Sequence, residues 1–267
     1  MNNSYVVSLL SQAATEVSFF GAKTANLAKA VQSGFAVPDG LAVSRLCTKS
    51  EFDSIAQKII DNLSPPIAVR SSAVKEDSVD KAFAGVFETY LGIRTVTDLM
   101  DTFLMVKNSG ATDLVKKYHG DVIQSEQIAV LIQRMVDATR AGVAFSCDPV
   151  TGESKVIIES SYGLGKSVVD GNVTPDSIDY FNDGTYKTFI GRKSIQIMLT
   201  DSGTNEQNTP AIDSVKCSLT EKEIKEIAEL ARQVESKLGF KADIEWAIDP
   251  DGVLWLLQAR PITTIIN

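Results

Sequence analysis

The sequence is short of the residues that build metal centres and disulfide frameworks. Its 267 residues include three cysteines, which lie far apart and form no C-x-x-C pair. We therefore expect neither a zinc site nor a disulfide scaffold, and we expect the protein to occupy a reducing compartment. The single histidine, His119, stands at an expected helix end, where a cation favours the helix dipole. One histidine without a nearby nucleophile pattern gives little support to a Ser-His-Asp hydrolase.

Basic charge and long apolar runs are also scarce. The net charge is −8, so no basic field attracts a nucleic-acid backbone, although a nucleotide site needs only a few local cations. No apolar run reaches membrane-spanning length, and the start Met1–Tyr5 lacks the pattern of a signal peptide. We therefore expect a cytoplasmic protein with neither nucleic-acid nor membrane partners.

The remaining composition is that of a globular protein, with 44% apolar and 22% charged residues. Hydrophobic periodicity predicts an α+β fold with a helix-rich first lobe, residues 1–133, and a mainly antiparallel second lobe, residues 134–267. The first lobe has expected helices at 21–34, 55–63 and 96–118 and a strand at 67–70. The second-lobe pattern starts with a strand at 128–136 and continues with strands at 142–147, 155–160, 177–181, 186–190 and 194–199. A polar loop is expected at 201–214, and a capped helix begins at Thr220 and ends at Gly239.

The end of the chain predicts a β-hairpin, with strands 243–248 and 253–261 around the turn D-P-D-G. A loop of two or four residues would keep the pairing parity and place polar side chains together on one side of an apolar sheet. The residues expected on that side are Glu245, Leu256, Gln258 and Arg260, and those on the other side are Trp246, Ile248 and Leu257. Burying the polar groups without partners is unfavourable, so a metal-bound phosphate is the expected partner.

Two cations of the first half are candidates for phosphate binding. Lys23 follows a glycine-alanine turn at the start of a helix, where free N–H groups attract anions, although a solvated lysine is the simpler interpretation. Arg70 ends an apolar strand beside serine hydroxyls and suits phosphate oxygens, but a structural pair with Glu76 or Asp77 explains it equally well. The stretch from Gly85 to Thr89 could approach a ligand closely, which is a weak signal by itself.

A glycine-rich segment of the second half does not fit a nucleotide motif. The run G-L-G-K-S at 163–167 lacks the first Walker A glycine, because Ser160 occupies that position. The run is therefore interpreted as a flexible glycine turn, and the contacts of Lys166 are left open. The apolar run at 128–136, interrupted by Gln133 and Arg134, is by itself typical of a core strand.

Taken in order, eight stretches resemble one family. They are G-A-K-T-A-N-L-A, V-P-D-G, A-V-R-S-S-A-V-K-E-D, F-A-G-V-F-E-T-Y-L, I-Q-R-M-V, D-P-V-T-G, Y-G-L-G-K-S-V-V-D-G-N-V-T-P-D, and D-I-E-W-A-I with L-L-Q-A-R-P-I-T, and they span residues 21–263. This order resembles the N-terminal ATP-binding domain of phosphoenolpyruvate synthase, pyruvate phosphate dikinase and rifampin phosphotransferase. The resemblance implies an ATP-grasp-type fold with two lobes and ATP in the cleft between them.

The resemblance also implies a role for each matching residue. Lys23 and Arg70 would hold the ATP phosphates, with Gly85 and Thr89 in a loop over them. Gln133, Met135 and Val136 would lie at the adenine, with backbone hydrogen bonds from Met135. Glu245 and Gln258 would hold Mg²⁺, and Arg260 would reach the transferring phosphate. Phosphoryl transfer depends mainly on positioning and charge neutralisation, which such a set supplies.

The chain also departs from the family pattern. Lys166 stands where the relatives usually have glutamate, the stretch from Ser44 to Arg70 is short, and no phosphohistidine or substrate domain follows the hairpin. The resulting hypothesis is an ATP·Mg²⁺-dependent phosphotransferase, or kinase, module that passes phosphate to a histidine on a separate protein or directly to a small molecule. The alternatives are a non-catalytic nucleotide-binding or regulatory subunit, and a piece excised from a longer enzyme.

Overall fold

The computed structural model describes residues 5–74, 89–109 and 128–263. The chain divides into two compact units, of which the first comprises Met1–Gln32 and Pro38–Met135. The second comprises Ser33–Val37 and Val136–Asn267.

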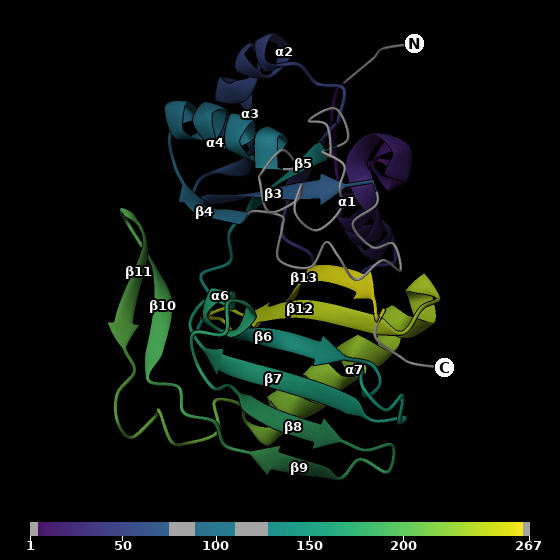
Figure 1. Cartoon of the computed structure of the whole chain (residues 1–267), viewed down its shortest axis with the longest axis vertical. Helices are drawn as coiled ribbons and strands as arrows, with labels where there is room; N and C mark the ends of the chain where they lie inside the picture. Colours follow the sequence, from purple (N-terminus) through teal and green to yellow (C-terminus); the bar gives the residue numbers. More distant parts are fainter. Residues whose placement is uncertain (1–4, 75–88, 110–127, 264–267) are drawn as a thin grey trace, which may run out of the picture. The chain divides into compact units, whose positions relative to one another are not determined.

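The first unit is built on a five-stranded antiparallel sheet with the strand order β1-β2-β5-β3-β4, of which β3, β4 and β5 are labelled in Figure 1. Its strands are β1 Val6–Ser8, β2 Gly40–Val43, β3 Ile67–Ala73, β4 Thr89–Ile93 and β5 Ile128–Arg134. Its helices are the 3-10 helix η1 Gln12–Thr15 and the α-helices α1 Val17–Gln32, α2 Lys49–Asp53, α3 Ala56–Leu63 and α4 Val96–Asn108.

The core of the first unit lies between the sheet and helices α2, α3 and α4. Ile67 and Val69 of β3 pack in the same cluster as Phe52 of α2 and Phe103 of α4, whose rings stack with centroids 3.8 Å apart. Side chains alternate along a strand, so the even-numbered residues of β3 point to the opposite face, where Ser72 contacts α1. The sheet therefore has one apolar face and one face that carries polar groups toward α1.

Helix boundaries in this unit follow the local sequence. The helical geometry of α1 is interrupted at Gly21, with φ 76° and ψ 166°, so Lys23 lies in the first turn after the interruption, as its sequence context predicts. Helix α3 ends at Leu63, and its C-cap residue Ser64 adopts the left-handed conformation directly before Pro65. Helix α4 ends at Asn108, earlier than expected, and its predicted continuation, like His119, lies outside the described residues.

The second unit contains a six-stranded antiparallel sheet with the order β13-β12-β6-β7-β8-β9 (Figure 1). Its strands are β6 Arg140–Phe145, β7 Val156–Tyr162, β8 Asp176–Tyr180, β9 Tyr186–Phe189, β12 Ala242–Ile248 and β13 Leu254–Pro261. The strands β10 Ile195–Thr200 and β11 Gly203–Asn208 form a separate hairpin, and the helices are α6 Lys166–Val169 and α7 Glu221–Leu238.

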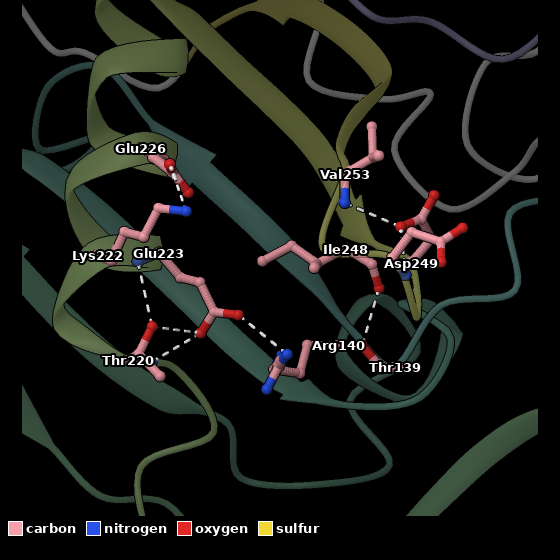
Figure 2. A network of polar contacts seen from close by, with 10 residues as sticks. Thr139, Arg140, Thr220, Lys222, Glu223, Glu226, Ile248, Asp249 and Val253 are labelled. Atoms are coloured by element: carbon pink, nitrogen blue, oxygen red, sulfur yellow. Dashed lines mark hydrogen bonds and ion pairs between the residues drawn. The ribbon is translucent and has the colours of Figure 1, made fainter.

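Helix α7 covers one face of this sheet and confirms the sequence prediction closely. Thr220 and Glu223 form the expected capping box, and Gly239 ends the helix in the left-handed conformation. The apolar stripe of α7 is buried against β7, β12 and the neighbouring strands. Trp246 of β12 has no solvent exposure. Glu223 also forms an ion pair with Arg140 of β6 at 2.9 Å, and this contact fixes the start of the helix to the sheet (Figure 2).

One element was predicted wrongly. Residues 203–208 form strand β11, not a loop, and pair with β10 along its length. The sequence G-T-N-E-Q-N lacks the apolar alternation of a half-buried strand, because all of its residues except Gly203 are exposed and the pairing comes from the backbone. The α+β class is confirmed. Within the described residues, no helix is both long and apolar enough to cross a bilayer.

Candidate functional site

In the first unit, the start of α1 is pressed against the end of β3. The backbone N–H of Thr24 donates to the Ser72 hydroxyl at 3.0 Å. A Cβ added at Gly21 would lie 2.1 Å from the Ser72 carbonyl oxygen, and the positive φ of Gly21 adds strain for any other residue. This close approach is possible only with glycine, and it fixes the helix turn that carries Lys23.

The predicted phosphate-binding cations lie in this region. Lys23 and Arg70 are both buried, with about 8% of their surface exposed, and Arg70 is on the face of β3 that points toward α1. Thr89 is the register partner of Arg70 across β3 and β4 and is exposed. The structure therefore brings Lys23, Arg70 and Thr89 into one unit, whereas Gly85 lies outside the described residues. Lys23 lies in a helix turn whose N–H groups attract anions, and Arg70 lies on the sheet face toward that helix, an arrangement that suits an anionic ligand.

The expected adenine-binding residues follow strand β5. Gln133 is buried, and its side-chain amide donates to the Pro38 carbonyl at 3.2 Å, so this side chain has a structural role in the unit. The Met135 N–H donates to the Pro66 carbonyl at 3.0 Å, and its sulfur accepts from the Gly92 N–H. The backbone N–H of Met135 is therefore already bonded, so only its carbonyl oxygen remains for the expected backbone contact with adenine. Met135 ends the first unit and Val136 begins the next stretch of the second.

In the second unit, the hairpin turn is organised by one carboxylate. Asp249 Oδ1 accepts from the backbone N–H of Asp251 at 3.1 Å and of Val253 at 2.8 Å. Its other oxygen accepts from Trp255 Nε1 at 2.8 Å. The adjoining Ile248 carbonyl accepts from both the N–H and the hydroxyl of Thr139, which ties the hairpin to the start of β6 (Figure 2).

The hairpin register confirms the expected polar row and corrects one of its members. Glu245 pairs directly with Gln258, so the two side chains share a face. A bulge follows, after which Trp246 pairs with Leu256, so Leu256 lies on the Trp246 side and not on the Glu245 side. The loop has an odd number of residues, contrary to expectation, so near the turn the residues of β13 lie on the opposite side from the one predicted. The extra residue Leu257 in the bulge shifts the register by one, which returns Gln258 to the predicted side, that of Glu245.

Asp243 is a member of this row that the sequence reasoning did not single out. It pairs in register with Arg260 and accepts a hydrogen bond from the Arg260 Nε at 2.8 Å. Burial raises the pKa of the Asp243 carboxyl, Arg260 opposes that rise, and Glu245 adds to it. Asp243 stands two residues before Glu245, a spacing that places both on one face of a strand and could have revealed it.

The Gln258 side chain is the clearest sign of a ligand in this row. It is only 5% exposed and pairs in register with Glu245 on the same face of the sheet. An oxygen from Gln258 opposite the Glu245 carboxylate suits a hard cation. No group of three or more histidine, cysteine or acidic residues in the described part is arranged to hold a metal. These two oxygen-bearing side chains therefore fit Mg²⁺ only if phosphate and water complete its shell.

Glu159 extends the same face across the sheet. Val143 of β6 pairs with Glu245 on one side and with Glu159 on the other, so all three side chains share the face opposite α7. Burial raises the pKa of Glu159, and the charge of Asp243 raises it further. A Cβ at Gly142 would lie 1.8 Å from the Glu159 carbonyl oxygen, so only glycine allows this approach of the strands. Glu159 could not be found from the sequence, because the pairing of β6 with β7 brings it there.

The G-L-G turn is tightly packed, contrary to the flexible turn expected from its glycines. Gly163 has φ 74°, and a Cβ there would lie 2.3 Å from the Ile197 carbonyl oxygen. That carbonyl accepts the Leu164 N–H at 2.7 Å. The contact of Lys166, which the sequence left open, is an ion pair with Asp170 one turn later at 2.7 Å.

The AMP/ATP-binding domain of pyruvate phosphate dikinase is the family whose sequence profile matches residues 48–267. The chain belongs to this family. The matched range includes Arg70, Glu245, Gln258 and Arg260, and it leaves out Lys23. The two helix-covered sheets confirm the expected α+β class, and the profile match confirms the expected resemblance to an ATP-binding domain.

Several curated proteins are similar to this family member. A probable phosphoenolpyruvate synthase of Methanothermobacter thermautotrophicus is 38% identical over 205 residues, which cover 74% of this chain and 30% of that protein. The uncharacterized phosphotransferase YvkC of Bacillus subtilis is 32% identical over 96% of this chain and 35% of its own length. The prodigiosin synthesizing transferase PigC of Serratia marcescens is 38% identical over 74% of this chain and 23% of its own length. The chain therefore spans about a quarter to a third of these relatives, and the family supports an ATP-binding module of the phosphotransferase type.

Two solved structures resemble the chain more distantly. Biotin carboxylase of Campylobacter jejuni has a TM-score of 0.42 and 14% identity over 91% of this chain and 40% of that one. D-alanine–D-alanine ligase of Bacillus anthracis has a TM-score of 0.39 and 12% identity over 89% of this chain and 55% of that one. Likenesses of this strength carry no functional information.

Proposed function

We propose that the chain binds ATP with Mg²⁺ and activates it for phosphoryl transfer, as a kinase-type phosphotransferase module. The observation that carries this proposal is the polar row of the last hairpin, in which Gln258, only 5% exposed, lies opposite Glu245. Carboxylate and amide oxygens on one face of a sheet can share a bound Mg²⁺ with phosphate and water.

Each residue has a definite task in this proposal. Lys23 and Arg70 bind the phosphates, with Gly85 and Thr89 over them, and Gln133, Met135 and Val136 lie at the adenine. Glu245 and Gln258 hold Mg²⁺, which neutralises phosphate charge when it is bound.

Arg260 completes the proposed set by binding the transferring phosphate. Asp243 accepts the hydrogen bond from its Nε and so orients the guanidinium, whose terminal nitrogens are the natural phosphate donors. Arginine and magnesium at the transferring group supply the positioning and charge neutralisation that phosphoryl transfer requires.

The acceptor is a histidine on a separate protein or a small molecule bound directly. Transfer by the histidine route leaves AMP and phosphate, and transfer to a small molecule leaves ADP or AMP, depending on which phosphate bond breaks. We place the activity in the cytoplasm.

The test follows ATP and Mg²⁺ by phosphorus NMR, with and without lysate of the source organism. Wild type should convert ATP, whereas Glu245→Gln should lower turnover by about 10²-fold or more. Glu206→Gln, an equal change at an exposed position of β11, should keep full turnover. AMP and phosphate that depend on a protein fraction indicate the histidine route, and ADP formed with small metabolites indicates a direct kinase. ATP binding without turnover, unchanged in Glu245→Gln, would instead support a non-catalytic nucleotide-binding subunit.

A further inference from the structure

The second unit carries an exposed apolar patch that the proposed function does not use. Phe189, Ile212 and Val215 are each more than 60% exposed, and Ile190 is nearly half exposed. Large apolar side chains scattered singly on a surface are ordinary, but a gathering of them marks an interaction site. These four residues, called here the 189–215 patch, come from the end of β9 and the segment before α7.

A buried polar cluster brings the two segments of the patch together. Asp176 Oδ1 accepts from Lys193 Nζ at 2.5 Å and from the Gly191 N–H at 3.0 Å. Asp176 Oδ2 accepts from the N–H and the hydroxyl of Ser218 at 2.7 and 2.8 Å. The Ser218 hydroxyl also bonds to Ser160 of β7.

The cluster has the properties of a rigid support. Asp176 and Lys193 have no solvent exposure, and the Lys193 N–H donates to the Ser214 carbonyl, between Ile212 and Val215 in sequence. A Cβ at Gly191 would lie 2.0 Å from the Pro175 carbonyl oxygen, so the chain after Ile190 is closely packed. The apolar side chains therefore stand on a fixed backbone and cannot easily turn inward.

Cations surround the patch in a chain whose net charge is −8. Arg192 and Lys216 are exposed and stand next to patch segments in the sequence, and Lys187 shares a strand face with Phe189. Two carboxylates lie near the patch. Asp179, opposite Lys187, binds Lys155 at 3.0 Å. Asp213 follows Ile212 and is partly buried, and after burial its charge is the next cause that raises the pKa of Tyr162. The patch thus presents an apolar centre with a basic rim.

We propose that the 189–215 patch is the docking surface for a separate acidic protein that inserts an apolar side chain between flanking carboxylates. Apolar cores with charged rims are typical of specific interfaces, and complementary charge selects the partner and speeds association. A second copy of this chain fits less well, because pairing the patch with itself places its own cations against each other. The proposal is independent of ATP chemistry, since none of the patch residues belongs to the nucleotide set.

The test uses the ¹⁵N-labelled chain and two short synthetic peptides. One peptide alternates leucine with glutamate, and the other replaces each glutamate by lysine. The glutamate peptide should shift the amide signals of the patch, the lysine peptide should not, and the shifts should weaken as salt rises from about 0.1 M to about 1 M. Equal binding of both peptides, binding elsewhere, or no binding overturns the proposal.

Two variants and a matched control sharpen the result. Arg192→Glu with Lys216→Glu should weaken the glutamate peptide by roughly tenfold or more, and Phe189→Ser with Ile212→Ser should abolish its binding. Leu10→Ser removes an apolar side chain that is 72% exposed in the first unit, and it should leave peptide binding unchanged. Analytical ultracentrifugation distinguishes the other occupant, since a dimer that Phe189→Ser with Ile212→Ser dissolves would show that the patch binds a second copy, against the proposal.

Discussion

The second unit contains two polar groups of side chains that differ in how far they are closed to solvent. Around Asp176, both carboxylate oxygens accept hydrogen bonds, and the ion pair with Lys193 is sealed from solvent. In the hairpin row, Arg260 is exposed and Glu245 is partly exposed. A closed network stabilises its own fold, whereas a polar row that reaches solvent is accessible to a ligand.

The comparison assigns different consequences to equivalent changes in the two groups. Loss of a member of the Asp176 cluster should affect folding. Loss of a member of the hairpin row should affect ligand binding and leave the fold nearly intact. The following predictions test that division, beginning with the largest effect on stability.

Asp176→Ala should lower the free energy of unfolding by about 3–5 kcal/mol, because Lys193 is left as an uncompensated buried charge. Urea denaturation followed by circular dichroism measures the change. Adding Lys193→Met to this variant should recover part of the loss. If Asp176→Ala unfolds like wild type, the cluster is not the structural support described here.

Thr220→Ala should lower the free energy of unfolding by about 1 kcal/mol. The change removes the hydroxyl that caps α7 and that bonds to Glu223, the carboxylate also held by Arg140 (Figure 2). Urea denaturation again provides the measurement. Thr220→Ser keeps the hydroxyl and should behave like wild type, so an equal loss in both variants would argue against the cap.

Glu159→Gln should raise the free energy of unfolding near neutral pH. The gain should be smaller than the loss expected for Thr220→Ala. Burial and the charge of Asp243 raise the folded-state pKa of Glu159 above 4.5, so the folded state binds this proton more tightly than the unfolded chain does. Stability from the protonated form is full below the unfolded pKa and is lost as the pH rises through the folded pKa. Thermal unfolding should show wild type and variant converging below about pH 4 and separating above it. A difference that does not change with pH would contradict the assignment.

Gln258→Leu should have the smallest effect on folding, with an unfolding free energy equal to or slightly above that of wild type. The substitution replaces an amide that is only 5% exposed by an apolar side chain of similar volume, which is less costly to bury. The same variant should lose Mg²⁺-dependent ATP binding, which isothermal titration calorimetry measures. A large loss of stability would show that the amide has a structural partner and would remove the main support for the ligand site.

Much of the fold could be predicted from local patterns. The capping box at Thr220, the helix stop at Gly239 and the turn into α1 depend on residues within a few positions of each other, so the sequence records them directly. Strand β11 could not be predicted in this way, because its exposed polar residues give no periodic signal. The tight packing of Gly163 was missed for a related reason, since its neighbour Ile197 is distant in sequence.

The candidate site divides in the same manner. The sequence by itself predicted Glu245 and Gln258 on one side of a hairpin and Lys23 at a helix start, because hairpin and helix geometry are local. Only the tertiary structure showed that a bulge, not the turn, sets the face of Gln258, and that Asp243 holds Arg260. It alone placed Glu159 on the same face, through β6, because bonding across strands joins residues that no sequence spacing connects.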